Sequence, residues 1–277
     1  MKITNLKGTA ILSNGVEMPY LGLGVYLSQE GPEVINAVKY ALDAGYRHID
    51  TASLYQNEKG VGIGIKESNV PRKEVFITSK VWNSQQGYDS TLRAFDESLA
   101  KLDTDYLDLY LIHWPVSGKY KDTWRALEKL YKDGRVRAIG VSNFLVHHLE
   151  DLLKSVEIKP MVNQVEFHPF VVQQHLLDFC KAQNIQFEAW SPLMQGRIFE
   201  VKVLKELAAT YNKTVAQIVL RWDLQKDVIT IPKSVRKEII ISNAQLFDFE
   251  LSAEDMKKID QLDRNRRVGA DPDHFDF

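Results

Sequence analysis

The sequence predicts one α/β domain over residues 1–277, built as a closed (β/α)8 barrel of parallel strands. Short apolar segments recur at nearly regular intervals, and each is followed by a segment whose apolar residues have helical spacing. The 277 residues suit eight strand–helix units, which typically need about 250 residues. No linker, low-complexity tract or change in composition marks a domain boundary. An open, doubly wound sheet is the alternative, but eight similar units favour closure.

The apolar segments define the barrel strands in order. They begin near Tyr20, Arg47, Val75, Leu107, Val136, Met161, Gln186 and Val228. The helical pattern is clearest after the third and fourth strands. One predicted helix has an apolar face of Leu92, Phe95, Leu99 and Leu102, and the next has one of Trp124, Leu127, Leu130 and Tyr131. Gly134 predicts the end of the second of these helices.

Additional elements are expected at both ends of the chain. Segments 9–12 and 16–18 flank Ser13-Asn14-Gly15, and an Asn-Gly pair favours a tight hairpin turn. We expect this β-hairpin to cap the N-terminal mouth, or bottom, of the barrel. Near the other end, the sequence predicts helices at 201–211 and 214–224, with Thr214 capping the second. A further C-terminal helix is expected after Ser252, where Ser252 and Asp255 resemble a capping box.

The composition excludes several classes of protein. Hydrophobic residues make up 44% and charged residues 26%, which is ordinary for a globular protein. The net charge of −2 and the lack of a Lys/Arg run give no reason to expect nucleic acid or a lipid surface as partner. The first residues lack an apolar stretch, so no signal peptide or membrane helix is expected there. Cys180 is the only cysteine, which rules out an internal disulfide and a cysteine-rich metal site. We expect a cytoplasmic protein in which Cys180 packs in the core.

Polar residues gather where the predicted strands end, which is where the active site lies in this architecture. Ionisable groups at the ends of apolar segments are costly to desolvate unless they are paired, so their convergence at one barrel mouth predicts a functional site. In strand order they are Asp50 and Tyr55, Lys80, His113, Ser142 and Asn143, Gln164 and Glu166, Trp190 and Ser191, and Lys233 and Ser234.

These residue types suit the reduction of a carbonyl group. A nearby Lys80 ammonium favours tyrosinate and so makes the Tyr55 phenol a stronger acid. Asp50 would hold that ammonium in place, and His113 would donate a hydrogen bond to the substrate oxygen. Hydride addition to carbon builds negative charge on that oxygen, which such donors stabilise, and Tyr55 then supplies the proton. No side chain donates hydride, so a cofactor must carry it.

Each residue also has a purely structural interpretation. Asp50 and Lys80 would serve as an ion pair inside the barrel, His113 as a hydrogen-bonded core histidine and Tyr55 as a packing residue. The glycines at 60, 62 and 64 follow no strand, and Gly22 and Gly24 lack the third glycine of the dinucleotide fingerprint. A dinucleotide would therefore bind across the barrel mouth and not at a Rossmann site.

Six motifs occur in order along nearly the whole chain. They are Asp43–Ala52 (DAGYRHIDTA) with Tyr55 and Asn57-Glu58, Leu107–Pro115 (LDLYLIHWP), Gly140–Phe144 (GVSNF), Asn163–Glu166 with His168-Pro169, Trp190–Leu193 (WSPL) and Ile231–Ser234 (IPKS). With these motifs the sequence resembles the aldo-keto reductase family. Trp190 and the short connection 116–119 resemble its compact bacterial branch, which includes glyoxal, methylglyoxal and 2,5-diketo-D-gluconate reductases.

The resemblance implies a catalytic tetrad of Asp50, Tyr55, Lys80 and His113, the same four residues reached from their chemistry. It also implies NADPH extended over the barrel mouth, with Ser142, Asn143 and Gln164 at the nicotinamide amide and Trp190 stacked on the ring. Ser191, Leu193 and Gln195 would hold the pyrophosphate, and Lys233, Ser234 and Arg236 the 2′-phosphate. The full set of implied cofactor contacts is Gly24, Val25, Asp50, Ser142, Asn143, Gln164, Trp190, Ser191, Leu193, Gln195, Lys233, Ser234, Val235, Arg236 and Asn243.

The sequence departs from the family pattern at two positions. Ile239 replaces an arginine common in the family, and Ser242 replaces a glutamate. One phosphate clamp is therefore missing, which weakens the preference for NADPH and leaves NADH as an alternative cofactor. The family's usual form is a monomer, and no metal is expected.

Aromatic residues are expected to line the substrate site. Tyr26, Trp82 and Trp114 would flank Tyr55 and His113, and such walls accept varied small carbonyl compounds with little specificity. The tail 271–277 either reaches the rim of this site with Phe275 and Phe277 or ends free of it.

Two other functions compete with reduction. In a metal-dependent hydrolase, His48, Asp50, His113, Glu166 and His168 would be candidate Zn²⁺ ligands. That function leaves Tyr55, Trp190 and the Lys233-Ser234 pair unused. In a regulatory protein, the cofactor site would persist without useful catalysis, and only an assay would separate the two.

Overall fold

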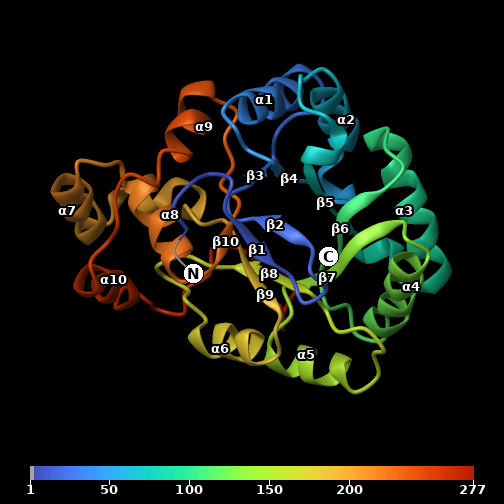
Figure 1. Cartoon of the computed structure of the whole chain (residues 1–277). Helices are drawn as coiled ribbons and strands as arrows, with labels where there is room; N and C mark the ends of the chain where they lie inside the picture. Colours follow the sequence, from blue (N-terminus) through green and yellow to red (C-terminus); the bar gives the residue numbers. More distant parts are fainter. Residues whose placement is uncertain (1–2) are drawn as a thin grey trace.

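The computed structural model describes residues 3–277, which form the predicted (β/α)8 barrel (Figure 1). The parallel strands pair with their neighbours in chain order. They are β3 (Leu23–Gly24), β4 (His48–Asp50), β5 (Phe76–Val81), β6 (Leu107–Ile112), β7 (Val136–Ser142), β8 (Val162–Glu166), β9 (Gln186–Trp190) and β10 (Ile229–Thr230). Each begins within a few residues of its predicted start, because a strand buried on both faces is a continuous apolar segment in the sequence.

The barrel closes between its first and last strands. Parallel bridges join Leu21 to Thr230 and Gly24 to Lys233, and the Gly24 amide donates to the Pro232 carbonyl at 3.2 Å. A Cβ atom at Gly24 would lie 2.8 Å from the Ile231 carbonyl oxygen, so this close approach requires glycine. The prediction of a closed sheet is therefore confirmed.

Helices surround the strands, as Figure 1 shows. In chain order they are α1 (Pro32–Asp43), α2 (Glu58–Lys66), α3 (Tyr88–Leu102), α4 (Tyr120–Lys132), α5 (Val146–Leu153), α6 (Gln174–Ala182), α7 (Lys202–Tyr211), α8 (Val215–Gln225), α9 (Lys237–Asn243) and α10 (Ala253–Asp260). Short 3-10 segments lie at Ser53–Tyr55, Arg72–Glu74, Asn83–Gln85 and Met194–Glu200. On the predicted apolar faces, Phe95 and Leu99 of α3 and Trp124 and Leu127 of α4 are buried against the barrel.

The predicted helix caps form, with one difference. Thr214 Oγ1 accepts from the Gln217 amide at 3.2 Å, and the Gln217 side chain accepts from the Thr214 amide at 2.9 Å. At α10, Ser252 Oγ accepts from the Asp255 amide, but the Ser252 amide donates to the Tyr211 hydroxyl. Asp255 accepts instead from the Ser252 hydroxyl, so this capping box is only half formed.

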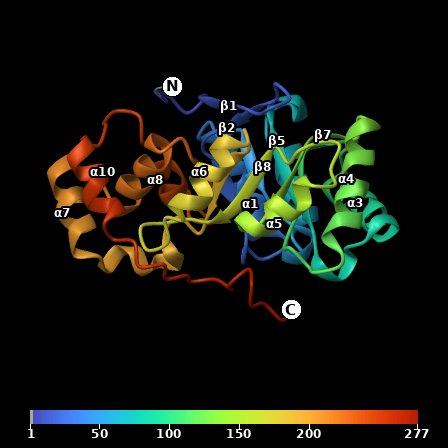
Figure 2. The same ribbon diagram turned by 90° about the horizontal axis from the view of Figure 1, so that it is seen from below.

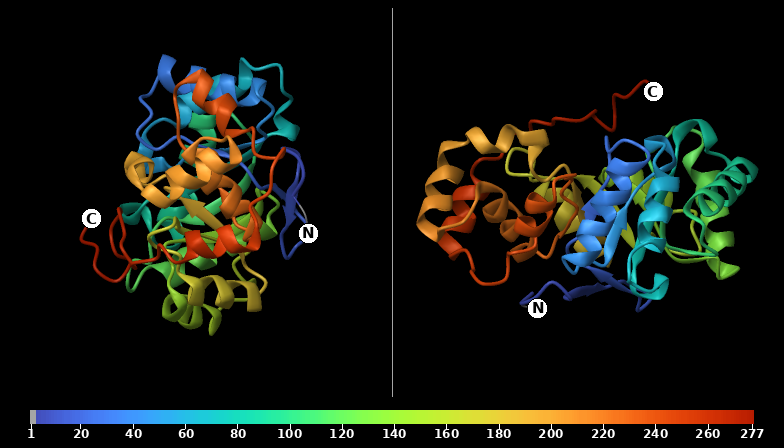
Figure 3. Two further views of the ribbon diagram at one scale, coloured as in Figure 1. Left: turned by 90° about the vertical axis from the view of Figure 1, so that its left-hand side faces the viewer. Right: turned by 90° about the horizontal axis from the view of Figure 1, so that it is seen from above.

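The predicted hairpin closes one end of the barrel. Its antiparallel strands are β1 (Thr9–Ile11) and β2 (Glu17–Pro19). Gly15 adopts a φ of 85° in the turn, and Asn14 Nδ2 donates to the Arg137 carbonyl of β7 at 2.9 Å. In Figures 2 and 3 the hairpin and the C-terminal tail lie at opposite ends of the barrel. Within residues 3–277, no helix combines the length and apolar character needed to cross a bilayer.

Candidate active site

Asp50, Tyr55 and Lys80 meet at the end of the barrel opposite the hairpin. Asp50 ends β4, Lys80 lies on β5, and Tyr55 ends the 3-10 turn after β4. Lys80 Nζ donates to Asp50 Oδ1 at 2.6 Å, to the Thr51 carbonyl at 2.9 Å and to the Tyr55 hydroxyl at 3.4 Å. The side chains of Lys80 and Asp50 are 0% and 2% exposed, so they form a buried ion pair. The remaining N–H donor of Lys80 points to the Tyr55 hydroxyl.

The charges of this group differ in one respect from the sequence prediction. Burial is the largest single effect and lowers the pKa of Lys80, but the charges of Asp50, Tyr55 and Glu188 and the hydrogen bond to Asp50 together outweigh it, so the pKa is raised and the ammonium persists. Burial raises the pKa of Tyr55 to about 12, and the Lys80 charge lowers it only in part. Lys80 thus acts in the predicted direction, but the surrounding protein has the larger effect. The Tyr55 phenol is therefore protonated at neutral pH, as a proton donor must be.

His113 directly follows β6 and completes the predicted tetrad. Its ring centroid lies 5.8 Å from that of Tyr55 and 5.1 Å from that of Trp82, edge-on in both cases. Burial, assisted by the Lys80 charge, holds the pKa of His113 well below its usual value, so the imidazole is neutral. Nδ1 is buried without a hydrogen-bond partner among the described residues, which leaves Nε2 as the nitrogen available to a substrate.

The expected aromatic walls surround these two residues. The Tyr26 and Tyr55 rings lie 5.0 Å apart, and Tyr26 is 47% exposed. Trp82 lies beside His113, and Trp114 is buried next to it in the chain. The structure therefore brings the predicted wall residues and the tetrad to one place.

The C-terminal tail reaches this site. Phe277 stacks on Trp82, with ring centroids 5.7 Å apart and an 8° angle between the planes, and its backbone oxygen accepts from Asn83 Nδ2 at 2.9 Å. Phe275 lies 5.0 Å from Trp114. Of the two alternatives left open by the sequence, the one in which the tail reaches the rim is therefore correct.

Glu166 and Trp190 support the start of the tail. Glu166 Oε1 accepts from the Val268 amide at 2.5 Å, and Gly269 donates to both oxygens of Glu166. A Cβ atom at Gly269 would lie 2.4 Å from the Trp190 ring, so glycine lets the tail cross the indole edge. Glu166 thus anchors the tail backbone.

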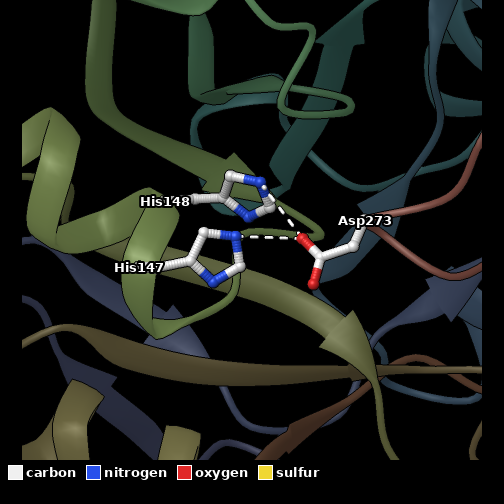
Figure 4. A group of neighbouring side chains, drawn as sticks. All are labelled: His147, His148 and Asp273. Atoms are coloured by element: carbon white, nitrogen blue, oxygen red, sulfur yellow. Dashed lines mark ion pairs between the residues drawn. The ribbon is translucent and has the colours of Figure 1, made fainter.

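Asp273 holds the middle of the tail against α5 (Figure 4). Its Oδ1 lies 2.9 Å from His147 Nε2 and 3.6 Å from His148 Nε2. The Leu145 amide donates to His148 Nδ1 at 3.2 Å, so the hydrogen of neutral His148 sits on Nε2 and points to Asp273. The three side chains form an ion-paired contact that holds the tail to α5, and metal binding at His148 Nε2 would need the other tautomer.

The predicted cofactor residues lie along the carboxyl ends of the strands and the segments that follow. Gly24 ends β3 and Val25 directly follows it, Ser142 ends β7, and Trp190 ends β9; the remainder are Asn143, Gln164, Ser191, Leu193, Gln195, Lys233, Ser234, Val235, Arg236 and Asn243. Lys233 and Arg236 are exposed, while Ser234 Oγ accepts from the Arg236 amide at 3.1 Å. These two cations could bind a phosphate monoester from solvent.

Asn143 is already engaged within the protein. Its Oδ1 accepts from Trp190 Nε1 at 2.9 Å, and its Nδ2 donates to the His113 carbonyl at 2.9 Å. Asn143 has a φ of 65°, a conformation that asparagine tolerates better than most residues. It therefore orients Trp190 in this structure, while its predicted contact with a nicotinamide stays a prediction.

Glu188 is a buried residue of the site that sequence reasoning missed. Gln164 Nε2 donates to Asp50 Oδ2 at 2.8 Å and to Glu188 Oε2 at 2.9 Å. Glu188 is fully buried on β9, and burial together with the Asp50 charge raises its pKa to about 8. The available signal was a carboxyl group inside the apolar segment 186–190, two residues before Trp190.

The candidate metal ligands do not assemble as the hydrolase hypothesis requires. Among residues 3–277, the group with ligand-like spacing here contains His48, Asp50 and Glu188. Glu166 and His168 instead bond to each other at 2.9 Å. The Asp50 oxygens already accept from Lys80 and Gln164, so an ammonium occupies the place that a cation would take.

A closed parallel barrel with its ionisable groups gathered at the carboxyl ends of the strands has the arrangement of a barrel enzyme. Comparison with known proteins identifies the class of enzyme. The model of the Aldo/keto reductase family matches residues 21–264. The chain therefore belongs to the aldo/keto reductase family of oxidoreductases.

Individual relatives match over the full length of the chain. Glyoxal reductase of Bacillus subtilis (strain 168) is 64% identical over 274 residues, which cover 99% of both chains. Methylglyoxal reductase DkgA of Salmonella typhimurium is 47% identical over 95% of this chain and 96% of its own. Among solved structures, a mutant of Gox0644 in complex with NADPH has a TM-score of 0.93 at 44% identity, covering 98% of this chain and 99% of that one.

Proposed function

We propose that this protein reduces small aldehydes and ketones, such as glyoxal and methylglyoxal, to alcohols with NADPH. The observation that carries the proposal is the buried Lys80–Asp50 pair, whose ammonium lies 3.4 Å from the Tyr55 hydroxyl. The names of the glyoxal and methylglyoxal reductases among its relatives support this substrate class. The aromatic walls suit small carbonyl compounds of varied shape.

Tyr55 is the proposed general acid. Its hydroxyl would donate its proton to the carbonyl oxygen as negative charge develops there, and Lys80 would stabilise the tyrosinate that remains. Asp50 keeps Lys80 charged and in place. Neutral His113 would donate a hydrogen bond to the same oxygen and so orient the carbonyl group. When NADPH is bound, its nicotinamide supplies the hydride.

The donor set fits this cofactor. The Gln164 amide and the Trp190 indole lie on neighbouring strands at the barrel mouth, and Lys233 and Arg236 are exposed beyond β10. A planar guanidinium and an ammonium suit a 2′-phosphate, so we propose NADPH as the preferred cofactor. Ile239, on α9, supplies no charge, and this lowers the expected discrimination against NADH.

We also propose that residues 1–277 act as one reductase domain, as a monomer in the cytoplasm. The single cysteine, Cys180, is buried, and burial raises its pKa to about 12, so it is poorly suited to redox chemistry.

Replacing Tyr55 with phenylalanine tests the proposal. Loss of the acid should lower kcat for methylglyoxal by about 10²–10⁴-fold, the usual contribution of general acid catalysis. The Kd for NADPH should stay near the wild-type value, measured by quenching of tryptophan fluorescence. Wild-type turnover in the variant would remove Tyr55 as the acid. Failure of the unaltered protein to oxidise NADPH with any of a panel of carbonyl compounds would favour a regulatory function instead.

A further inference from the structure

Glu188 contacts the side chain that the proposed function places at the nicotinamide. Gln164 Nε2 lies between two carboxyl groups, 2.8 Å from Asp50 Oδ2 and 2.9 Å from Glu188 Oε2. A primary amide nitrogen carries two hydrogens, so these two acceptors use both. The amide oxygen, Oε1, is then the atom of Gln164 left to accept a hydrogen bond from a ligand.

The two carboxyl groups hold the amide in this orientation together. A half-turn about the last side-chain bond would place Oε1 against Asp50 Oδ2, oxygen against oxygen, and would take the N–H donor away from Glu188 Oε2. Asp50 cannot move aside, because its other oxygen is bound to Lys80 at 2.6 Å. Glu188 is fully buried, so it too has little freedom to move away.

The reduction chemistry itself does not account for Glu188. None of the tetrad side chains depends on it for a hydrogen bond in the described structure, and its Oε1 has no hydrogen-bond partner there, with His48 Nε2 lying 3.7 Å away. Burying such a group costs free energy. Whether Glu188 is protonated or ionised, it keeps an oxygen that accepts from Gln164.

We propose that Glu188 is a positioning residue for NADPH, which fixes the Gln164 amide so that Oε1 accepts from the carboxamide N–H of the nicotinamide. This inference rests on the proposed function. It predicts that the carboxamide N–H of the cofactor strengthens binding only when residue 188 carries a hydrogen-bond acceptor, although the two groups do not touch.

Two substitutions separate the acceptor from the shape of the side chain. Glu188→Met keeps the length and removes the acceptor, whereas Glu188→Gln keeps an acceptor oxygen. The Kd for NADPH, measured without substrate by quenching of tryptophan fluorescence, should rise about three- to tenfold in Glu188→Met, as expected for the loss of one hydrogen bond. In Glu188→Gln it should stay within about twofold of the wild-type value.

A cofactor analogue provides the decisive comparison. The reduced 3-acetylpyridine analogue of NADPH has a methyl ketone in place of the carboxamide and therefore no N–H to donate. Wild-type protein should bind it more weakly than NADPH, and Glu188→Met should weaken it no further. Equal weakening of both cofactors by Glu188→Met, or an unchanged Kd for NADPH, would overturn the proposal.

A matched control measures the general effect of altering a buried carboxyl group. Asp223 is also fully buried, and it accepts from Thr230 Oγ1 at 2.7 Å without contacting Gln164. Asp223→Asn should leave both Kd values unchanged.

If Glu188→Met does not fold, Gln164→Leu removes the acceptor directly and should abolish the preference for NADPH over the analogue; a preference that persists would also overturn the proposal. Wild-type protein that fails to bind NADPH would refute the proposed function itself, a result distinct from any effect of position 188.

Discussion

Deleting residues 274–277 should widen the range of substrates. The deletion removes Phe277, which stacks on Trp82, and Phe275, which lies against Trp114. A bulky aromatic aldehyde must compete with Phe277 for the face of Trp82, whereas a small dicarbonyl need not. An aromatic pair contributes about 0.5–1.5 kcal/mol beyond its buried area, which corresponds to about a two- to tenfold change. Since Phe277 is 52% exposed, values in the lower half of this range are expected.

The assay compares two substrates with saturating NADPH. We expect kcat/KM for an aromatic aldehyde such as 4-nitrobenzaldehyde to rise about two- to fivefold on deletion, while the value for methylglyoxal changes by less than about twofold. Asp271→Ala is the control, because this tail residue accepts from the Asp273 amide and contacts no wall residue. Equal changes for both substrates, or no change for either, would refute the reasoning that Phe277 occupies the Trp82 face.

Three other substitutions have expected effects of their own. Asp273→Ala should act like the deletion but more weakly, raising the ratio of kcat/KM for the aromatic aldehyde to kcat/KM for methylglyoxal by up to about fivefold. The reason is that the half-exposed ion pair of Asp273 with His147 contributes at most about 1 kcal/mol. An effect larger than that of the deletion would contradict this prediction. Arg236→Ala should raise KM for NADPH about tenfold and leave KM for NADH unchanged, since only NADPH carries the 2′-phosphate. If steady-state kinetics show equal increases in KM for NADPH and for NADH, Arg236 does not contact the phosphate. Burial lowers the pKa of His48 to about 3, so its protonation favours the unfolded chain and stability falls as pH drops below about 6.5. The free energy of unfolding, measured with urea, should fall between pH 6.5 and pH 5 by about 2 kcal/mol less in His48→Asn than in wild type. An identical fall in both proteins would show that His48 is not the group responsible.

The fold was predictable because its signal is local. Each barrel strand is an apolar segment, so the starts near Val75 and Leu107 agree with β5 and β6 to within one residue. The turn at Asn14-Gly15 and the cap at Thr214 depend on the conformations and hydrogen bonds of a few neighbouring residues. Such features need no knowledge of the remainder of the chain.

The arrangement at the site was predictable in part. Because the architecture sends the carboxyl ends of all strands to one mouth, Asp50 and Lys80 could be placed together from the sequence alone. The pKa of Tyr55 could not be predicted from the sequence, since it depends on how deeply the protein buries the hydroxyl. The path of the tail was also undetermined, because Glu166 and Asp273 act on it from distant parts of the sequence.

The feature that sequence reasoning missed has a physical cause. Glu188 alternates with apolar neighbours on a strand, and a carboxyl group at such a position breaks the local rule that barrel interiors are apolar. Violations of this kind concentrate where a protein gives up stability for function. Inside this barrel, four buried polar residues form one connected set, from Lys80 through Asp50 and Gln164 to Glu188. The charge proposed to act in catalysis at Lys80 is thus linked, through Asp50, to the amide proposed to face the cofactor, so the two halves of the proposed site depend on one chain of hydrogen bonds. On this view, removing the hydrogen-bonding group of any one member of the set should affect both cofactor affinity and turnover, whereas substituting a buried carboxyl group outside it, such as Asp223, should affect stability alone.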